Sequence, residues 1–219
     1  RKLSVYREPE FTGMIDLIRN ADVAFTNLEV LFHDYEPYPM HQSGGTYMRA
    51  APQIAEELAW AGFDMVARAN NHTGDYGVLG QELTTKYVEQ AGLVHAGAGR
   101  SLSAAREARY LERADGRVAL VSMASTFPDH SRAGRSRDDI PPRPGLSPLR
   151  YSTTYMVPRT DFEALRRLAA RLGVSGDDID ADAAEGEIFG RHFVVGDEAA
   201  VVTKPHRQDL EEIAAVEVD

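Results

Sequence analysis

The chain has 219 residues, enough for one large domain or two small ones, and its 43% apolar and 26% charged residues are typical of a globular protein. The formal net charge of −10 argues against sequence-independent binding to nucleic acid, which requires a basic face. The absence of cysteine excludes disulfides, thiol nucleophiles and cysteine-bound zinc, and no apolar run is long enough to span a membrane. We therefore expect a soluble chain, and the choice between the cytoplasm and the cell envelope stays open.

The first half of the chain alternates helical and extended patterns. Apolar spacing, a proline start and glycine stops predict helices over residues 11–19, 52–61, 78–91 and 101–108, and short apolar runs predict strands over 22–30, 63–69 and 93–96. This strand–helix–strand rhythm favours parallel strands joined by crossover helices. Ligands of such sheets bind beyond the carboxyl ends of the strands, so polar residues that follow a strand are candidates for a site.

The second half of the chain has a different pattern. It predicts hairpins that turn at residues 115–116 and 196–197, a strand over 151–157, and helices over 161–172 and 207–216. The proline-rich and arginine-rich segment 127–148 is either a solvated loop or a lid that grips an anionic substrate through Arg132 and Arg135. Residues 174–187 are predicted to form an acidic insert, and residues 1–219 a single domain.

The run Asn70-Asn71-His72 follows the apolar strand predicted over residues 63–69. An Asn carbonyl oxygen and an imidazole nitrogen suit a divalent ion such as manganese, iron or zinc. The alternative is an ordinary turn, because Asn, Gly and Asp are common turn residues. Asp75 either orients the ring of His72 or caps the helix predicted to begin at residue 78.

Asn27 and Glu29 form a second polar cluster at a strand end. Strand alternation places them on one face and Leu28 on the other, where an amide and a carboxylate can share a ligand or a metal. The alternative is a pair that faces solvent. If the sheet is parallel, this cluster and the Asn70 loop converge on one edge.

The long segment 32–50 lies between these clusters and contains three tyrosines, among them Tyr47, as well as His33 and His41. A loop of this length with this composition suggests a wall that faces substrate. The two histidines are better interpreted as packing or surface residues than as ligands.

Three ordered motifs carry a resemblance to a known family: DVAFTNLE at residues 22–29, AGFDMVARANNHTGDYG at 61–77 and AGLVHAGAG at 91–99. Together they resemble the CapA family of poly-γ-glutamate capsule-biosynthesis proteins, in the calcineurin-like metallophosphoesterase superfamily. The resemblance is strong over residues 22–108 and looser through 219.

The resemblance implies an α/β fold, a metallophosphatase-like four-layer sandwich of two mixed sheets flanked by helices, here truncated at both ends. Asn71 and His72 match the superfamily's Asn-His pair, which provides a metal ligand and a catalytic histidine, and Asn70 stands where that motif has glycine. Asn27 and Glu29 match the family's N-L-E element, and Asp75 matches its D-Y-G. A Gly-Asp element before residue 1 and His-rich motifs after residue 219 are expected to supply further site residues.

These matches define the expected site by role. We predict catalytic roles for His72 and Asp75, and metal ligation by Asn71 and Glu29. For substrate binding, the sequence points to Asn27, Asn70, Tyr47, Arg132 and Arg135.

Three functions follow from the resemblance. The first is metal-assisted hydrolysis or transfer on a polyglutamate-like or other anionic peptide, with one or two ions of manganese, iron or zinc. The second is metal-independent peptide epimerisation, as in lasso-peptide epimerases related to this family. The third is non-catalytic tethering of polyglutamate by the arginines of segment 127–148. Nucleic acid is not an expected partner.

Overall fold

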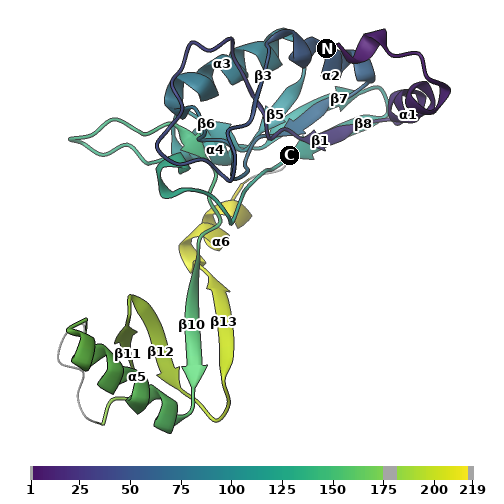
Figure 1. The fold of residues 1–219 in the computed structure, drawn as a ribbon. Coiled ribbons are helices and arrows are strands. Elements are labelled where there is room, and N and C mark those ends of the chain that lie inside the picture. The colour runs from purple at the N-terminus through teal and green to yellow at the C-terminus, as the bar shows by residue number, and fades with distance from the viewer. Residues whose placement is uncertain (1, 175–181, 217–219) are drawn as a thin grey trace. The chain divides into compact units, whose positions relative to one another are not determined.

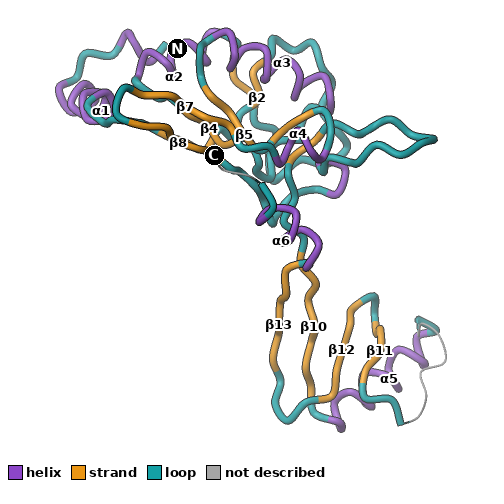
Figure 2. The backbone as a smooth tube through the Cα atoms, turned by 180° about the vertical axis from the view of Figure 1, so that it is seen from behind, coloured by secondary structure: helices purple, strands orange, loops and turns teal. Residues whose placement is uncertain are grey.

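The computed structural model describes residues 2–174 and 182–216, which belong to two compact units (Figures 1 and 2). The first unit contains Arg1–Leu149 and Glu211–Asp219, and the second contains Arg150–Leu210. The single domain predicted over residues 1–219 stays a prediction.

A three-stranded parallel sheet forms the centre of the first unit. Its strands β1 (Phe25–Asn27), β4 (Met65–Ala67) and β5 (Val94–Ala96) lie in the order β1-β4-β5. Asn27 pairs with Ala67, and Ala67 pairs with Ala96, so the three strands end level with one another. The predicted parallel sheet is therefore confirmed, and the loops that follow β1 and β4 begin at the same edge.

The helices of the first unit follow the predicted pattern closely. They are the 3₁₀ helix η1 (Leu3–Val5) and the α-helices α1 (Pro9–Arg19), α2 (Gln53–Ala61), α3 (Gly77–Gln90) and α4 (Leu102–Arg106). Gly62 ends α2 with φ of 102°, a left-handed conformation that favours glycine. Ser101 caps α4 by accepting a 3.1 Å hydrogen bond from the backbone N–H of Ala104. A core that includes the fully buried Phe32, Val66 and Val88 packs α2 and α3 against the sheet.

Three pairs of short strands complete the first unit. They are β2 (Leu31–Phe32) with β3 (Arg49–Ala50), β6 (Ala98–Gly99) with β9 (Gly145–Leu146), and the hairpin β7 (Arg109–Arg113) with β8 (Gly116–Leu120). This hairpin is the predicted one. Segment 127–148 contains the 3₁₀ helix η2 (Asp129–Ser131) and strand β9, and Figure 1 shows it as a long loop beside β6.

The second unit is a four-stranded mixed sheet with one helix on it. The strand order is β11 (Glu185–Ile188), β12 (Arg191–Val195), β10 (Tyr151–Val157) and β13 (Ala200–Pro205). Helix α5 (Arg159–Leu172) packs on the sheet through the buried Phe162 and Ala169. Helix α6 (Arg207–Ala214) follows β13, and its residues from Glu211 on belong to the first unit.

The hairpin predicted to turn at residues 196–197 is wrong. Strand β10 lies between β12 and β13, parallel to the first and antiparallel to the second. The hairpin in this unit is instead β11–β12, which turns at Phe189 and Gly190, both with positive φ. Of the acidic insert predicted over 174–187, residues 175–181 lie outside the described residues, and Glu185 begins β11.

The mixed α/β class is confirmed, and the arrangement is consistent with part of a metallophosphatase-like fold. Within residues 2–174 and 182–216, no helix is both long enough and apolar enough to cross a membrane.

Candidate functional site

The two polar clusters predicted from the sequence meet at the edge of the parallel sheet. The side-chain amide of Asn70, beyond β4, donates to Asn27 Oδ1 at 3.2 Å and to the carbonyl of Leu28 at 2.8 Å. Asn27 in turn donates to Glu29 Oε1 at 3.1 Å. Leu28 points into the core, as strand alternation predicted. The side chain of Asn70 thus joins both loops, and its predicted contact with substrate stays a prediction.

His72 and Asp75 form a buried pair in the loop that follows β4. His72 Nδ1 lies 2.8 Å from Asp75 Oδ2, and the side chain of Asp75 is fully buried. Because an ionised carboxylate only accepts hydrogen bonds, Nδ1 carries the proton in this pair. The second ring nitrogen, Nε2, has no hydrogen-bond partner among the described residues, so it is the atom left for proton transfer.

Asp75 also binds the backbone of segment 32–50, which we call the aromatic loop. Its Oδ1 accepts from the backbone N–H of Gly44 at 3.0 Å, and Oδ2 accepts from the N–H of Met48 at 2.8 Å. The backbone carbonyl of Asp75 accepts from the N–H of Met40 at 2.9 Å. The possible role of Asp75 as a helix cap is not realised, because α3 has Tyr76 at its N-cap position and no side-chain cap. Its carboxylate orients His72 instead.

Asn71 faces the same loop. Its side-chain amide donates to the carbonyl of Gly44 at 2.7 Å, which leaves its Oδ1 available. A Cβ atom at Gly44 would lie 2.3 Å from the backbone oxygen of Asn71, so only glycine fits there. The contact between Asn71 and Gly44 therefore fixes the side-chain oxygen that we predicted as a metal ligand.

The donor atoms do not complete a metal centre. Asn71 Oδ1 and the Glu29 carboxylate are oxygen donors of the kind that divalent ions accept. However, among the described residues no group of three or more His, Asp or Glu side chains is placed to hold a metal ion. Asn71 and Glu29 remain predicted ligands.

The fold of the Asn70–Asp75 loop depends on Thr73 and Gly74. The hydroxyl of Thr73 lies 2.6 Å from the carbonyl of Arg68, and it accepts the N–H of Asn70 at 3.0 Å. A Cβ at Gly74 would overlap Ser131, at 2.0 Å from its hydroxyl oxygen. Segment 127–148 thus packs directly on the candidate loop.

Tyr47 and His33 belong to the aromatic loop between β2 and α2. The hydroxyl of Tyr47 donates to the carbonyl of Met40 at 2.5 Å, and 41% of the residue is exposed. His33 is fully buried and its ring packs on Tyr76 at 4.2 Å between centroids, in keeping with the predicted packing role. Burial and the neighbouring Arg49 lower the pKa of His33. Tyr47 is thus held within the loop yet open to a ligand.

The arginines of segment 127–148 do not form a common anion-binding face. Arg132 pairs with Asp129 at 3.3 Å, and Arg137 pairs with Asp139 at 3.6 Å. Arg135 forms an ion pair with Glu212. Within the part of the chain that the structure describes, neither Arg132 nor Arg135 is bonded to the Asn70–Asp75 loop, so their predicted contact with substrate stays a prediction.

A buried cation lies behind the loop. The guanidinium of Arg68 donates to Thr85 Oγ1 at 2.5 Å and to the carbonyl of Gln81 at 3.0 Å, which ties β4 to α3. Burial lowers the pKa of Arg68 to about 10, so it stays charged at neutral pH. Burial and the charge of Arg68 lower the pKa of His95 to about 4, so that ring is neutral. These residues support the loop from within the core.

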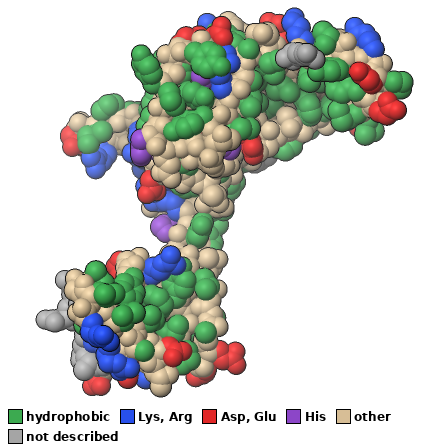
Figure 3. All heavy atoms as spheres, in the orientation of Figure 1, with side chains coloured by type: hydrophobic (Ala, Val, Ile, Leu, Met, Phe, Trp, Pro, Cys, Tyr) green, Lys and Arg blue, Asp and Glu red, His purple; other side chains and the backbone are tan. Residues whose placement is uncertain are grey.

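An apolar hollow lies next to Asn27. Its volume is about 360 Å³, and it is lined by Phe25, Asn27, Ala67, Ala69, Leu120, Val121, Ser122 and Met123. Phe25 is 54% exposed, and Figure 3 shows many other hydrophobic side chains on the visible face of the first unit. The hollow offers an apolar surface beside the polar site.

Sequence reasoning missed the contribution of the loop backbone. The N–H groups of Gly44 and Met48 hold Asp75 in place. Every residue except proline has a backbone N–H, so the residue type does not reveal such a donor. The Gly44-Gly45 pair was the available signal, because a glycine pair marks a point where chains approach closely.

The α/β fold with an Asn-His loop at the strand ends defines the class of protein, one with a metallophosphatase-like architecture. The family model described as "Bacterial capsule synthesis protein PGA_cap" matches residues 4–179, so the chain belongs to this family. This confirms the resemblance found in the sequence.

Three relatives illustrate the range of similarity. The proteins y4sH and y4uA of Sinorhizobium fredii, both described as uncharacterized, are each 35% identical over 216 residues, which is 97% of this chain and 47% of theirs. The capsule biosynthesis protein CapA of Bacillus anthracis is 29% identical over 119 residues, 53% of this chain and 29% of its own. The chain thus spans about half the length of the first two relatives.

Proposed function

We propose that this chain belongs to an enzyme that cleaves or transfers a bond in a polyglutamate-like or other anionic peptide, with His72 as the acid–base residue and with assistance from a divalent metal. The observation that carries the proposal is the His72–Asp75 pair, 2.8 Å between Nδ1 and Oδ2, at the carboxyl edge of a parallel sheet. Membership of the capsule-synthesis family supports a role in making or processing such a polymer.

The chemistry rests on the two nitrogens of one ring. Asp75 keeps the proton on Nδ1, so Nε2 of neutral His72 is a base. It takes a proton from the attacking water or amine as the new bond forms. The same proton then passes to the leaving group, which separates as a neutral species. A divalent metal, when bound, would polarise the carbonyl or phosphoryl oxygen.

The substrate is proposed from the surroundings of the pair. The aromatic loop is held against Asp75, and Tyr47 is partly exposed on it. Exposed tyrosines bind peptide backbones well, because they present a large rigid surface with a polar end. Tyr47 is therefore the proposed wall of a peptide groove.

The test compares the full-length protein with His72→Ala. Poly-γ-glutamate is incubated with each protein, without metal and with manganese, iron or zinc, and released amines are measured. We expect activity to fall about 10²–10⁴-fold in His72→Ala, the usual contribution of one acid–base group. Asp209→Asn in the second unit is the control for a general loss of stability. Wild-type levels of activity in His72→Ala would refute the assignment.

Epimerisation of a peptide is the second candidate, favoured because the His72–Asp75 pair alone can move a proton. In heavy water an epimerase incorporates deuterium at the Cα that it inverts. Mass spectrometry of a glutamyl peptide after incubation would show a gain of one mass unit per exchanged centre. Exchange that persists in EDTA and disappears in His72→Ala favours this reading over metal-assisted hydrolysis.

A further inference from the structure

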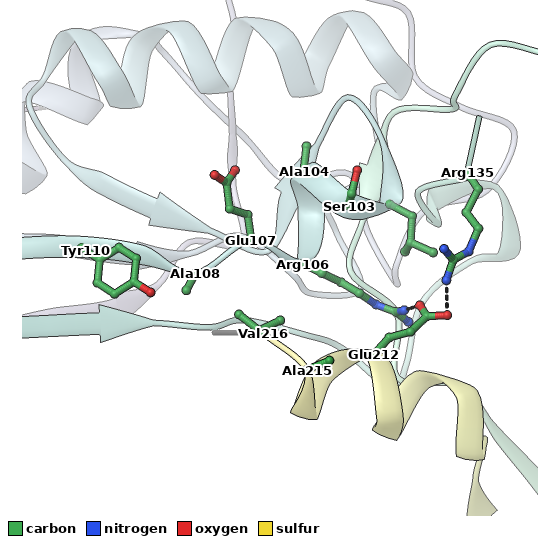
Figure 4. A pocket seen from close by; sticks show the side chains of 11 residues that line it. Ser103, Ala104, Arg106, Glu107, Ala108, Tyr110, Arg135, Glu212, Ala215 and Val216 are labelled. Atoms are coloured by element: carbon green, nitrogen blue, oxygen red, sulfur yellow. Dashed lines mark hydrogen bonds and ion pairs between the residues drawn. The ribbon is translucent and has the colours of Figure 1, made fainter. Parts of the chain in front are cut away.

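A pocket of about 770 Å³ in the first unit is separate from the Asn70–Asp75 loop (Figure 4). Its walls come from α4 and the residues after it, from the segment around Arg135, and from residues 212–216. Leu102, Ala104, Ala108, Tyr110, Ala215 and Val216 supply most of the apolar lining. Arg106, Arg135 and Glu212 meet at one end of the pocket, whereas Ser103 and Glu107 line it elsewhere and Glu107 pairs with Arg109.

At this end two guanidinium groups bind a single carboxylate. Glu212 forms ion pairs with both Arg106 and Arg135, one through each carboxylate oxygen. The side chain of Arg106 is only 6% exposed, whereas that of Arg135 is 57% exposed. Arg106 is also fixed by a 3.2 Å hydrogen bond from its guanidinium to the carbonyl of Pro148. The three side chains together carry a net charge of +1.

This arrangement is that of a carboxylate-binding site filled by a side chain of the same protein. A planar guanidinium matches a carboxylate in shape and charge, and two of them around one carboxylate form a strong anion site. Burial of Arg106 excludes water and strengthens its attraction for an anion. The partly exposed Arg135 and the open volume beside it give a ligand a route to the site.

We propose that this pocket binds a ligand with a free carboxylate, which replaces the carboxylate of Glu212 between Arg106 and Arg135. The apolar wall then receives the aliphatic part of the ligand. Two sources share this chemistry: the carboxylates of a glutamyl chain and a small free dicarboxylate. The inference is independent of the proposed function, since binding here requires neither His72 nor a reaction.

The binding test uses isothermal titration of the full-length protein with two probes, γ-linked triglutamate and glutarate. Glu212→Gln removes the competing charge, so we expect its affinity for a carboxylate to rise about tenfold. Arg135→Gln removes one guanidinium, so we expect affinity to fall about tenfold, the size of effect typical of a charged hydrogen bond. Arg137→Gln is the matched control, because it removes the same charge from an arginine that binds Asp139 outside the pocket.

Each outcome decides the proposal. Binding of triglutamate alone that tightens in Glu212→Gln identifies a glutamyl chain as the ligand of this pocket, and binding of glutarate that tightens in the same variant identifies a small dicarboxylate. No binding of either probe by the wild type or by Glu212→Gln, with thermal unfolding showing both proteins folded, would overturn the proposal. Equal losses in Arg135→Gln and Arg137→Gln would also overturn it. His72→Ala should bind as the wild type does, so this result is distinct from the test of catalysis.

Discussion

Replacing Asp75 with Asn tests the central contact of the candidate site. The carboxylate accepts three hydrogen bonds: Oδ2 from His72 Nδ1 and the N–H of Met48, each at 2.8 Å, and Oδ1 from the N–H of Gly44 at 3.0 Å. An amide has one oxygen and one NH₂ group, so it cannot accept at both positions.

The expected loss of unfolding free energy follows from the better of the two orientations of the new amide in Asp75→Asn, the one that leaves fewer donors unpaired. With the oxygen placed where Oδ2 lies, two donors keep their acceptor, and the N–H of Gly44 faces an NH₂ group. Asp75 is fully buried, so water cannot replace the lost partner. One buried unsatisfied donor costs about 1–3 kcal/mol of unfolding free energy. At about 2–4 °C per kcal/mol for a unit of this size, Tm should fall by roughly 2–12 °C.

The assay combines thermal unfolding, which gives Tm as its midpoint, with the activity measurement. Asp75→Asn should lower both the unfolding midpoint and the activity, because a neutral amide oxygen at the Oδ2 position is a weaker acceptor for His72 Nδ1 than a carboxylate and does not stabilise a protonated ring. Asp209→Asn is the matched control: Asp209 is a fully buried aspartate that pairs with Arg150 at 2.8 Å in the second unit. It should lower stability and leave activity intact. An unchanged unfolding midpoint in Asp75→Asn would refute the reasoning.

Two further predictions concern the loop and the core behind it. Gly44→Ala places a Cβ 2.3 Å from the backbone oxygen of Asn71, so we expect the free energy of unfolding in urea to fall by about 1–3 kcal/mol. Gly13→Ala is the control: its Cβ would have no atom within 4 Å, so it should not destabilise the protein. In the folded protein the pKa of His95 is about 4, below the ordinary histidine value of 6.5, so between these pH values the unfolded state binds a proton that the folded state does not. Stability should therefore fall as the pH drops from 6.5 to 4, by on the order of 3 kcal/mol in total. His95→Gln should remove this slope, and an identical pH dependence in wild type and variant would contradict it.

The sequence predicted the local elements well because local signals determine them. The Ser101 cap, the Gly62 stop and the β7–β8 turn each depend on a few neighbouring residues. Convergence of Asn27 and Asn70 was also predictable, since parallel strands in a sheet end at one edge.

Pairings between distant segments were not predictable in the same way. Strands β12 and β13 are close in sequence and have turn residues between them, which is the usual pattern of a hairpin. The earlier strand β10 separates them, because it offers pairing edges to both. Likewise, the pocket arginine Arg106 lies far in sequence from its partner Glu212, and neither residue belongs to a motif.

Asp75 shows why a residue's role was harder to predict than its position. From the sequence, an aspartate shortly before a helix is a cap by default, and orientation of His72 was the less usual alternative. In the structure the carboxylate contacts both the imidazole and the backbone of the aromatic loop. The two therefore cannot move independently: a ligand that draws the N–H groups of Gly44 or Met48 away from Asp75 also changes what holds the Nδ1 proton of His72. A ligand that binds the loop is thus expected to loosen the contact that orients the ring of His72.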